Sequence, residues 1–453
     1  MPFIGDQATE FFSAKGMAEG SEIPILGINS SMPEFRQGPI YVWLLAILFS
    51  IFGYSPEITS YFAASVGIMA VGALYIFTRK LFGRRTSFIA SGLLATSPLA
   101  VAHSQFSFII NPIPLVSVAY LVSLIEYTKR KKMTLLWPSI IFGLLFQFEL
   151  ASAPLFLLLP IAWKIKSKTK TSDMLSMLKG LIVGLLPQIV FDITNNFSQL
   201  TKFIAWVGYR VISFFGYKQE HTVSVEKLKN TLTIFQTYWQ KFISWDSSLI
   251  FAIFIAILFS GAIIWAKRKT KFKSPSALVW AWLLILSVSY FIHGGPSEAY
   301  FPAFFIPLVL AFSWTLGQIS QRASRTISIA MVAGIMAFNT IFLINTDIIS
   351  KSVKRSEKSL PTAVWLPRYS EQTEAVSLII NNVESPIHLR ALGPGSEFSS
   401  YLDNYRYLLA LEEYEFSPTG APVWVIRGEE AENPPFINMR SYKLDHVTIS
   451  VPF

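Results

Sequence analysis

Ten apolar runs, each close to the length that crosses a lipid bilayer, follow one another between residues 57 and 346. A hydrocarbon core about 30 Å thick needs roughly 20 helical residues, so runs of this length predict membrane-spanning helices. Charged residues make up only 15% of the chain, against about 25% in soluble domains, which agrees with this interpretation. We therefore expect an all-α polytopic membrane protein with about ten spans, at residues 57–79, 86–103, 110–127, 134–149, 151–165, 177–193, 248–266, 275–293, 301–318 and 326–346.

Basic residues gather in the loops that follow every second run. The clusters are Arg79-Lys80 with Arg84-Arg85, then residues 129–132, 164–170 and 267–273, and finally Arg322 with Arg325. The short loops between them contain no Lys or Arg. Because Lys and Arg are enriched in cytoplasmic loops, the clusters are predicted to face the cytoplasm. They also account for the net charge of +10, so we expect no nucleic-acid partner.

This topology divides the chain into three regions. Residues 1–56 form an outer loop with an interfacial helix in the aromatic stretch 39–53, and residues 57–346 form a transmembrane domain with an outer loop at 194–247. Residues 347–453 alternate helix and strand candidates, at residues 372–382, 387–392, 398–412, 423–427 and 442–451. This alternation predicts a small extracytoplasmic α/β domain.

Three charged residues stand in the outer region before the first span. Asp6 and Glu10 are four residues apart and would share one face of a helix, and Arg36 follows in the same loop. The low dielectric of a nearby membrane strengthens interactions between such charges. Asp6 could instead cap a helix, and Arg36 could anchor the chain at the interface.

Several motifs occur in an order that resembles one known family. They are Ala18-Glu19-Gly20, the run from Arg36 to Trp43, Phe52-Gly53-Tyr54, the run from Thr78 to Arg85, and Ala95-Thr96-Ser97-Pro98. With the outer-loop acid in front of them, they resemble GT-C glycosyltransferases of the protein O-mannosyltransferase and aminoarabinose-transferase type, which is glycosyltransferase family 39-like. The resemblance covers roughly residues 3–345 and leaves out the tail.

The resemblance implies a GT-C fold in the cell membrane and transfer of a sugar from a polyprenyl-phosphate donor to a hydroxyl on the outer face. Asp6 would be the general base that takes the acceptor proton, and Arg36 would hold the donor phosphate. Retaining enzymes normally need a second carboxylate as nucleophile, so a single base implies inversion, with Glu10 as an accessory substrate contact. The acceptor would be a lipid, a glycan or a protein.

Further candidates lie near the outer ends of the spans. His103, Glu298 and Tyr300 lie in two outer loops; a protonated His or a Tyr hydroxyl can bind phosphate, and the run around Tyr300 resembles the family's lipid-phosphate region. Asp192 ends a span and is either an acceptor contact or a cap. Glu149 is the most deeply embedded acid, and acids within membranes are functional candidates by default.

Metal and cofactor signals are weak. The chain has no cysteine, no Asp-x-Asp pair and no His-x-x-x-His pair, so neither thiolate chemistry nor a short metal motif is available. We therefore predict an enzyme without a metal or a cofactor.

Two other functions remain open. A lipid or oligosaccharide transporter, such as a flippase, would show charges in mid-span, matched broken helices or an internal repeat, and none is convincing here. An oligosaccharide ligase or polymerase would use Arg and His in a large outer loop, and the loop 194–247 offers Arg210 and His221.

The resemblance also implies a membrane-crossing helix just before Asp6. We therefore expect about twenty apolar codons in frame upstream of Met1, which would then be an internal start.

Overall fold

The fold is taken from a computed structural model. It describes residues 4–30, 35–105, 107–130, 132–166, 171–215, 225–245, 247–267, 275–318, 322–346, 369–393, 396, 399–427, 439–444 and 447–452.

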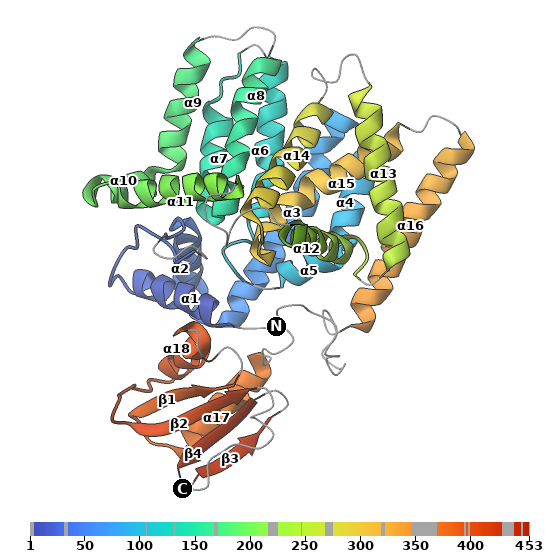
Figure 1. Ribbon diagram of the computed structural model, residues 1–453. Helices are drawn as coiled ribbons and strands as arrows, with labels where there is room; N and C mark the ends of the chain where they lie inside the picture. Colours follow the sequence, from blue (N-terminus) through green and yellow to red (C-terminus); the bar gives the residue numbers. More distant parts are fainter. Residues whose placement is uncertain are drawn as a thin grey trace.

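A helix or a pair of helices lies at each of the ten expected spans, which confirms the predicted all-α membrane fold. These helices are α3 (Pro56–Phe82), α4 (Arg84–Thr96), α6 (Ile113–Lys129), α7 (Leu136–Phe148), η1 (Leu150–Leu157) running into α8 (Leu158–Ile165), α9 (Thr171–Gly184), α13 (Ser248–Ala266), α14 (Ser276–His293), α15 (Pro302–Gly317) and α16 (Arg322–Asn345). Most of them stand upright in Figure 1. A short helix, α5 (Pro98–Ser104), follows α4. Within the described residues, four helices are long and apolar enough to cross a membrane singly, or five with one bent pair counted.

The expected span 177–193 is divided between two helices that meet at a sharp bend. Helix α9 ends at Gly184, and α10 (Leu186–Thr194) leaves it at an angle of 75°. Pro187 lies in the first turn of α10, where its missing N–H is tolerated at a helix start but could not continue a straight helix. Together with α11 (Ser198–Phe214), α10 lies across the upright helices, and α12 (Val225–Ile243) also lies across them somewhat nearer the α/β domain (Figure 1).

Residues 4–30 and 35–55 hold two helices, with loop segments between them that dock onto the bundle. They are α1 (Gly5–Ala18) and α2 (Ile40–Phe52), the latter at the predicted interfacial helix. In the loop, Gln37 exchanges backbone hydrogen bonds with Gly27 (2.8 Å) and Ile28 (2.9 Å), and the Gly38 N–H donates to the Gln147 carbonyl on α7 at 3.0 Å. A Cβ at Gly38 would lie 2.4 Å from the Gln147 side chain, so this approach requires glycine.

The tail forms the predicted small α/β domain. Its elements are α17 (Tyr369–Asn382), β1 (Ile387–Leu392), η5 (Ser399–Leu402), α18 (Asp403–Leu411), β2 (Ala421–Arg427), β3 (Met439–Lys443) and β4 (Val447–Pro452). The sheet has the order β1-β2-β4-β3, with β1 and β2 parallel and the other pairs antiparallel. Helix α18 faces α1 (Figure 1), where the Tyr407 ring meets Phe11 edge-on at 5.6 Å and its hydroxyl donates to the Tyr54 carbonyl at 2.7 Å.

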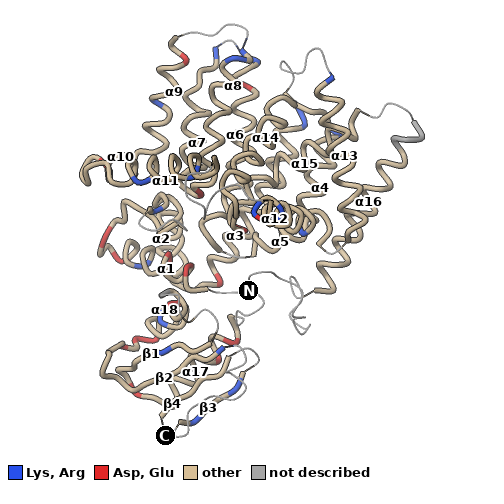
Figure 2. The backbone as a smooth tube through the Cα atoms, in the orientation of Figure 1, with Lys and Arg blue, Asp and Glu red and all other residues tan. Residues whose placement is uncertain are grey.

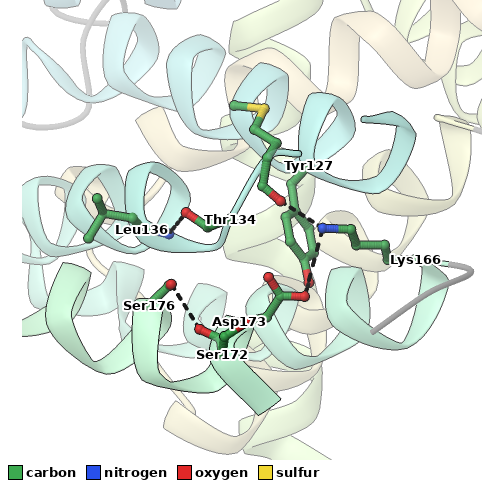
Figure 3. Close-up of polar contacts among 8 residues, drawn as sticks. Tyr127, Thr134, Leu136, Lys166, Ser172, Asp173 and Ser176 are labelled. Atoms are coloured by element: carbon green, nitrogen blue, oxygen red, sulfur yellow. Dashed lines mark hydrogen bonds and ion pairs between the residues drawn. The ribbon is translucent and has the colours of Figure 1, made fainter. Parts of the chain in front are cut away.

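The opposite end of the bundle carries the basic helix ends, and Figure 2 shows Lys and Arg around the top of α8 and at the top of α13. One of these residues is buried. The Lys166 ammonium lies 3.7 Å from the Asp173 carboxylate and 4.0 Å from the centre of the Tyr127 ring, and the Tyr127 hydroxyl donates to Asp173 at 3.1 Å (Figure 3). This cluster joins α6, α8 and α9 at the end away from the α/β domain.

Candidate functional site

A cavity of about 180 Å³ lies where α11 crosses the bundle. Its wall is mostly apolar and is built by α11, the end of α14, the start of η1 and the loop after α1. The described lining residues are Ser30, Glu149, Leu150, Ala151, Ala153, Pro154, Phe203, Trp206, Val207, Arg210, Val211, Ser289, Tyr290, Ile292, His293 and Tyr300. An apolar cavity with a few converging polar groups is the usual form of a small-molecule site.

Arg210 supplies the cavity with a cation. The side chain is half-buried, its Nη1 donates to the His293 carbonyl at 3.4 Å, and the guanidinium lies 5.4 Å from the centre of the Trp206 ring. The buried Nε has no hydrogen-bond partner among the described residues. Arg210 also lines a second cavity of about 50 Å³ together with Lys227 and Thr231. The site is therefore positively charged on the α11 side.

Aromatic and imidazole rings close the cavity on the α14 side. The Tyr290 hydroxyl donates to the Tyr300 carbonyl at 2.9 Å, and the ring centres of His293 and Tyr300 are 5.4 Å apart. Tyr300 is buried and lines the cavity, and its predicted substrate contact stays a prediction.

Glu149 supplies the cavity with an acid. It lies between α7 and η1, where it caps η1 by accepting from the Ala151 N–H at 3.1 Å. The side chain of Gln37 lies beside the carboxyl group and favours its charged form. The segment that begins with Arg36 is thereby tied directly to the cavity wall.

Asp6 is exposed in the first turn of α1 and does not line the cavity. Gly5 beside it packs against the α/β domain so closely that a Cβ would lie 1.5 Å from the Ser400 carbonyl oxygen. One turn later, Thr9 donates to the Asp403 carboxylate at 3.4 Å. The α/β domain therefore forms one side of the surface on which Asp6 stands.

Glu10 points the other way and is fully buried. Burial raises the pKa of the Glu10 carboxyl well above its usual value of 4.5, the charge of Asp6 raises it further, and the Ile109 backbone N–H partly offsets both. Neither carboxyl oxygen has a hydrogen-bond partner of normal geometry among the described residues. Asp6 is therefore exposed to solvent and Glu10 is buried, although both lie on α1.

Arg36 is exposed, and its guanidinium faces its own loop. Its Nε donates to the Gly27 carbonyl at 2.8 Å, and its backbone N–H donates to the Gln199 side chain at 2.9 Å. Arg36 does not line the cavity. Its predicted contact with a donor phosphate stays a prediction.

His103 and Glu298, both predicted substrate contacts, lie together. The His103 Nε2 is 3.4 Å from the Glu298 carboxylate, and both side chains are largely buried. The Asn111 side chain also donates to the His103 carbonyl. Burial, and then the charge of Glu298, raise the pKa of the nearby Tyr238 hydroxyl above its usual 10.0. The pair therefore bridges α5 and the turn before α15, next to Tyr300.

Asp192 caps the start of α11, which is one of the two roles that the sequence allows for it. Its carboxylate accepts from the backbone N–H groups of Gln199 at 2.8 Å and Leu200 at 3.0 Å, at the start of α11. Acceptors at a helix start satisfy otherwise unpaired N–H groups. Asp192 thereby fixes the helix that carries Arg210, and its predicted substrate contact stays a prediction.

Within the described residues, no group of three His, Asp or Glu side chains could hold a metal ion. The absence of a metal or cofactor requirement stays a prediction. The residue that sequence reasoning underweighted is Arg210, which entered only through the ligase alternative. The signal was available in the spacing, because Phe203, Trp206, Val207 and Arg210 recur at intervals of three and four residues and so share one side of a helix.

Comparisons with known proteins support this fold. Residues 36–191 match the family model of dolichyl-phosphate-mannose-protein mannosyltransferases. No curated protein sequence matches the chain. The fold is similar to that of ArnT from Cupriavidus metallidurans bound to undecaprenyl phosphate, with 10% identity, a TM-score of 0.62, and coverage of 99% of this chain and 94% of that one.

Two structures from Archaeoglobus fulgidus are also similar. The oligosaccharyltransferase in complex with zinc and sulfate has 13% identity and a TM-score of 0.52, over 95% of this chain and 65% of that one. The oligosaccharyltransferase AglB with an inhibitory peptide and a dolichol-phosphate has 12% identity and a TM-score of 0.51, over 95% and 66%. The chain therefore has the GT-C fold, and the predicted resemblance to GT-C glycosyltransferases is confirmed. Asp6, Glu10 and Arg210 lie outside the matched segment.

Proposed function

We propose that the protein is a membrane glycosyltransferase that moves a sugar from a polyprenyl-phosphate donor to an acceptor hydroxyl. The reaction takes place on the face that carries α1 and the α/β domain. The observation that carries this proposal is the apolar cavity with Arg210 in its wall, built by a helix that lies across the spans. Proteins with the same fold have been solved with undecaprenyl phosphate and with a dolichol-phosphate.

The cavity has the chemistry that a lipid-linked phosphate needs. Arg210 offers a planar fork of N–H groups that suits two phosphate oxygens. Phe203, Trp206 and Val207 from the same helix offer apolar surface to the polyprenyl chain. The exposed apolar side chains on the outer surface of α10 and α11, such as Val190 and Ile204, suit a helix pair at the membrane interface. We therefore assign the donor phosphate to Arg210.

Asp6 acts as the general base in this proposal. The carboxylate takes the acceptor proton while the acceptor oxygen attacks the anomeric carbon and the polyprenyl phosphate leaves. Direct displacement by one oxygen inverts the anomeric centre. The exposed position of Asp6 supports this role, because an acceptor can reach the carboxylate from the solvent side of α1.

We place the face that carries α1 and the α/β domain outside the cytoplasm. The ends of α6 and α13 that carry basic residues point away from the α/β domain (Figure 2), and such ends normally face the cytoplasm. The catalytic loop (residues 1–56), the transmembrane domain (57–346) and the extracytoplasmic domain (347–453) then follow in order. The acceptor is a lipid, a glycan or a protein of the cell envelope.

Membranes with and without the protein, supplied with labelled polyprenyl-phosphate sugars, test the proposal. Labelled product should appear only with the protein. Asp6→Asn should abolish transfer but leave donor binding nearly unchanged, because it removes the base and keeps the side-chain volume. Glu19→Gln at the far end of α1, where Glu19 pairs with Lys15 at 3.7 Å, is the matched control and should keep activity. Sugar transfer by Asp6→Asn at the wild-type rate would show that Asp6 is not the general base.

One observation favours a second candidate, an oligosaccharide ligase or polymerase. Arg210 comes from the outer loop that such enzymes use and lines the cavity, whereas His221 lies outside the described residues. A ligase would retain activity in Asp6→Asn and lose it in Arg210→Gln. A flippase would move labelled lipid across the membrane without forming a new product.

A further inference from the structure

One acid, Glu149, lines the donor cavity among its described residues, although neither a phosphate nor a polyprenyl chain calls for an acid. A buried carboxylate is costly unless hydrogen bonds compensate it, and an anion beside it is repelled. Glu149 is only 4% exposed, and it therefore needs a reason to face this cavity.

The surroundings of Glu149 hold it in one position. Its cap on η1 fixes the backbone, and the side chain of Gln37 from the docked loop lies beside the carboxyl group. Gln37 is fixed in turn by its backbone bonds to Gly27 and Ile28. A preorganised group of this kind can bind a ligand without an ordering cost.

The carboxylate has room for one more hydrogen-bond donor. Two carboxylate oxygens offer about four acceptor positions. Among the described residues, one hydrogen bond of normal geometry reaches the carboxylate, from the Ala151 N–H at 3.1 Å, and the side chain of Gln37 lies beside it. A ligand that reaches the cavity can thus supply a further donor.

We propose that Glu149, oriented by Gln37, binds a hydroxyl group of the donor sugar and so contributes to sugar specificity. This inference rests on the proposed function. With the phosphate at Arg210 and the lipid chain on the apolar wall, the sugar is the part of the donor that carries hydrogen-bond donors. A site built to accept a hydrogen bond from a hydroxyl discriminates against analogues that lack it.

The alternative is that Glu149 only caps η1. Glu149→Gln separates the two roles, because the amide oxygen can still accept from the Ala151 N–H while the charge and one acceptor oxygen are lost. Ser247→Ala is the matched control: Ser247 caps α13 by accepting from the Ile250 N–H at 3.3 Å and does not line the cavity.

The test measures binding of two probes to the purified full chain in detergent. One is sugar-free undecaprenyl phosphate, and the other is the undecaprenyl-phosphate sugar that the wild type transfers. Glu149→Gln should weaken the sugar-bearing probe about tenfold to a hundredfold and leave the sugar-free probe within about twofold. Ser247→Ala should change neither probe.

Two results would overturn the inference. If Glu149→Gln weakens the binding of both probes equally, Glu149 has only a structural role. If Glu149→Gln binds both probes as tightly as the wild type does, Glu149 has no role in binding. Deoxy forms of the sugar donor add a second check: removing the hydroxyl that meets Glu149 should weaken binding to the wild type but not to Glu149→Gln. If the wild type binds neither probe, the proposed function fails and not merely the role of Glu149.

Discussion

Replacing Arg210 by Gln should weaken binding of the polyprenyl phosphate more than any change at Arg36. A guanidinium has five N–H donors, and in Arg210 one of them is engaged with the His293 carbonyl at a long 3.4 Å. The Nε is buried without a hydrogen-bond partner among the described residues, so Nε and a terminal nitrogen can both meet a phosphate. In Arg36 the Nε already donates to Gly27 at 2.8 Å.

The expected loss follows from the number of hydrogen bonds removed. A hydrogen bond to a charged group contributes about 1.5–3 kcal/mol. Two of them give roughly 3–6 kcal/mol, and we take the lower end because Arg210 is only half-buried and solvent screens part of its charge. A loss of about 3 kcal/mol raises the Kd roughly a hundredfold. Arg210→Lys keeps the charge and loses the fork, so it should weaken binding about tenfold.

Equilibrium binding of undecaprenyl phosphate to the purified protein, at fixed salt concentration, checks this series. Arg36→Gln is the comparison, because it tests the phosphate contact that the sequence resemblance implies. We expect Arg36→Gln to stay within about threefold of the wild type, since its guanidinium lies outside the cavity. If Arg210→Gln binds as tightly as the wild type while Arg36→Gln loses a hundredfold, the phosphate lies at Arg36 and the assignment to Arg210 is wrong.

Two further predictions concern stability in detergent. The folded protein holds a proton on Glu10 that the unfolded chain releases above its usual pKa of 4.5, so wild-type stability falls as the pH rises from 4.5 toward the raised folded-state pKa. The melting temperature of Glu10→Gln minus that of the wild type should therefore grow with pH across this window, and a constant difference would contradict the buried state of Glu10. Asp173→Ala leaves Lys166 buried without its carboxylate and should cost about 3–5 kcal/mol, whereas Tyr127→Phe removes one hydrogen bond worth about 1 kcal/mol. Equal thermal shifts in these two variants would show that Lys166 does not depend on the ion pair.

The spans could be predicted from the sequence because each depends on a local property. An apolar run long enough to cross a bilayer has few alternatives to a helix. The break between α9 and α10 has a local cause as well, in Pro187, but a proline is compatible with both a kinked span and two separate helices. The bend of 75° becomes definite only through packing, where Gly143 and Gly184 bring the backbones of α7 and α9 close together.

The candidate site was less predictable because its residues meet only in the fold. His103 and Glu298 were each singled out for their outer position, yet nothing in the sequence indicated that they lie 3.4 Å apart. The sequence allows Asp192 to be either a substrate contact or a helix cap. The carboxylate is seen to cap α11, because α11 starts where its backbone N–H groups can donate to Asp192. Glu149 was an isolated embedded acid until the docked loop brought Gln37 against it.

The two faces of α1 show why the position of a catalytic acid escapes local reasoning. Asp6 and Glu10 are one turn apart and are predicted to share one side of the helix, but Glu10 is buried while Asp6 is exposed. The packing of Tyr407 on Phe11 and of Ser400 on Gly5 fixes this orientation from outside the transmembrane domain. A carboxylate serves as a base only if its direction toward the acceptor is held, so the α/β domain contributes to the proposed chemistry through the orientation of α1.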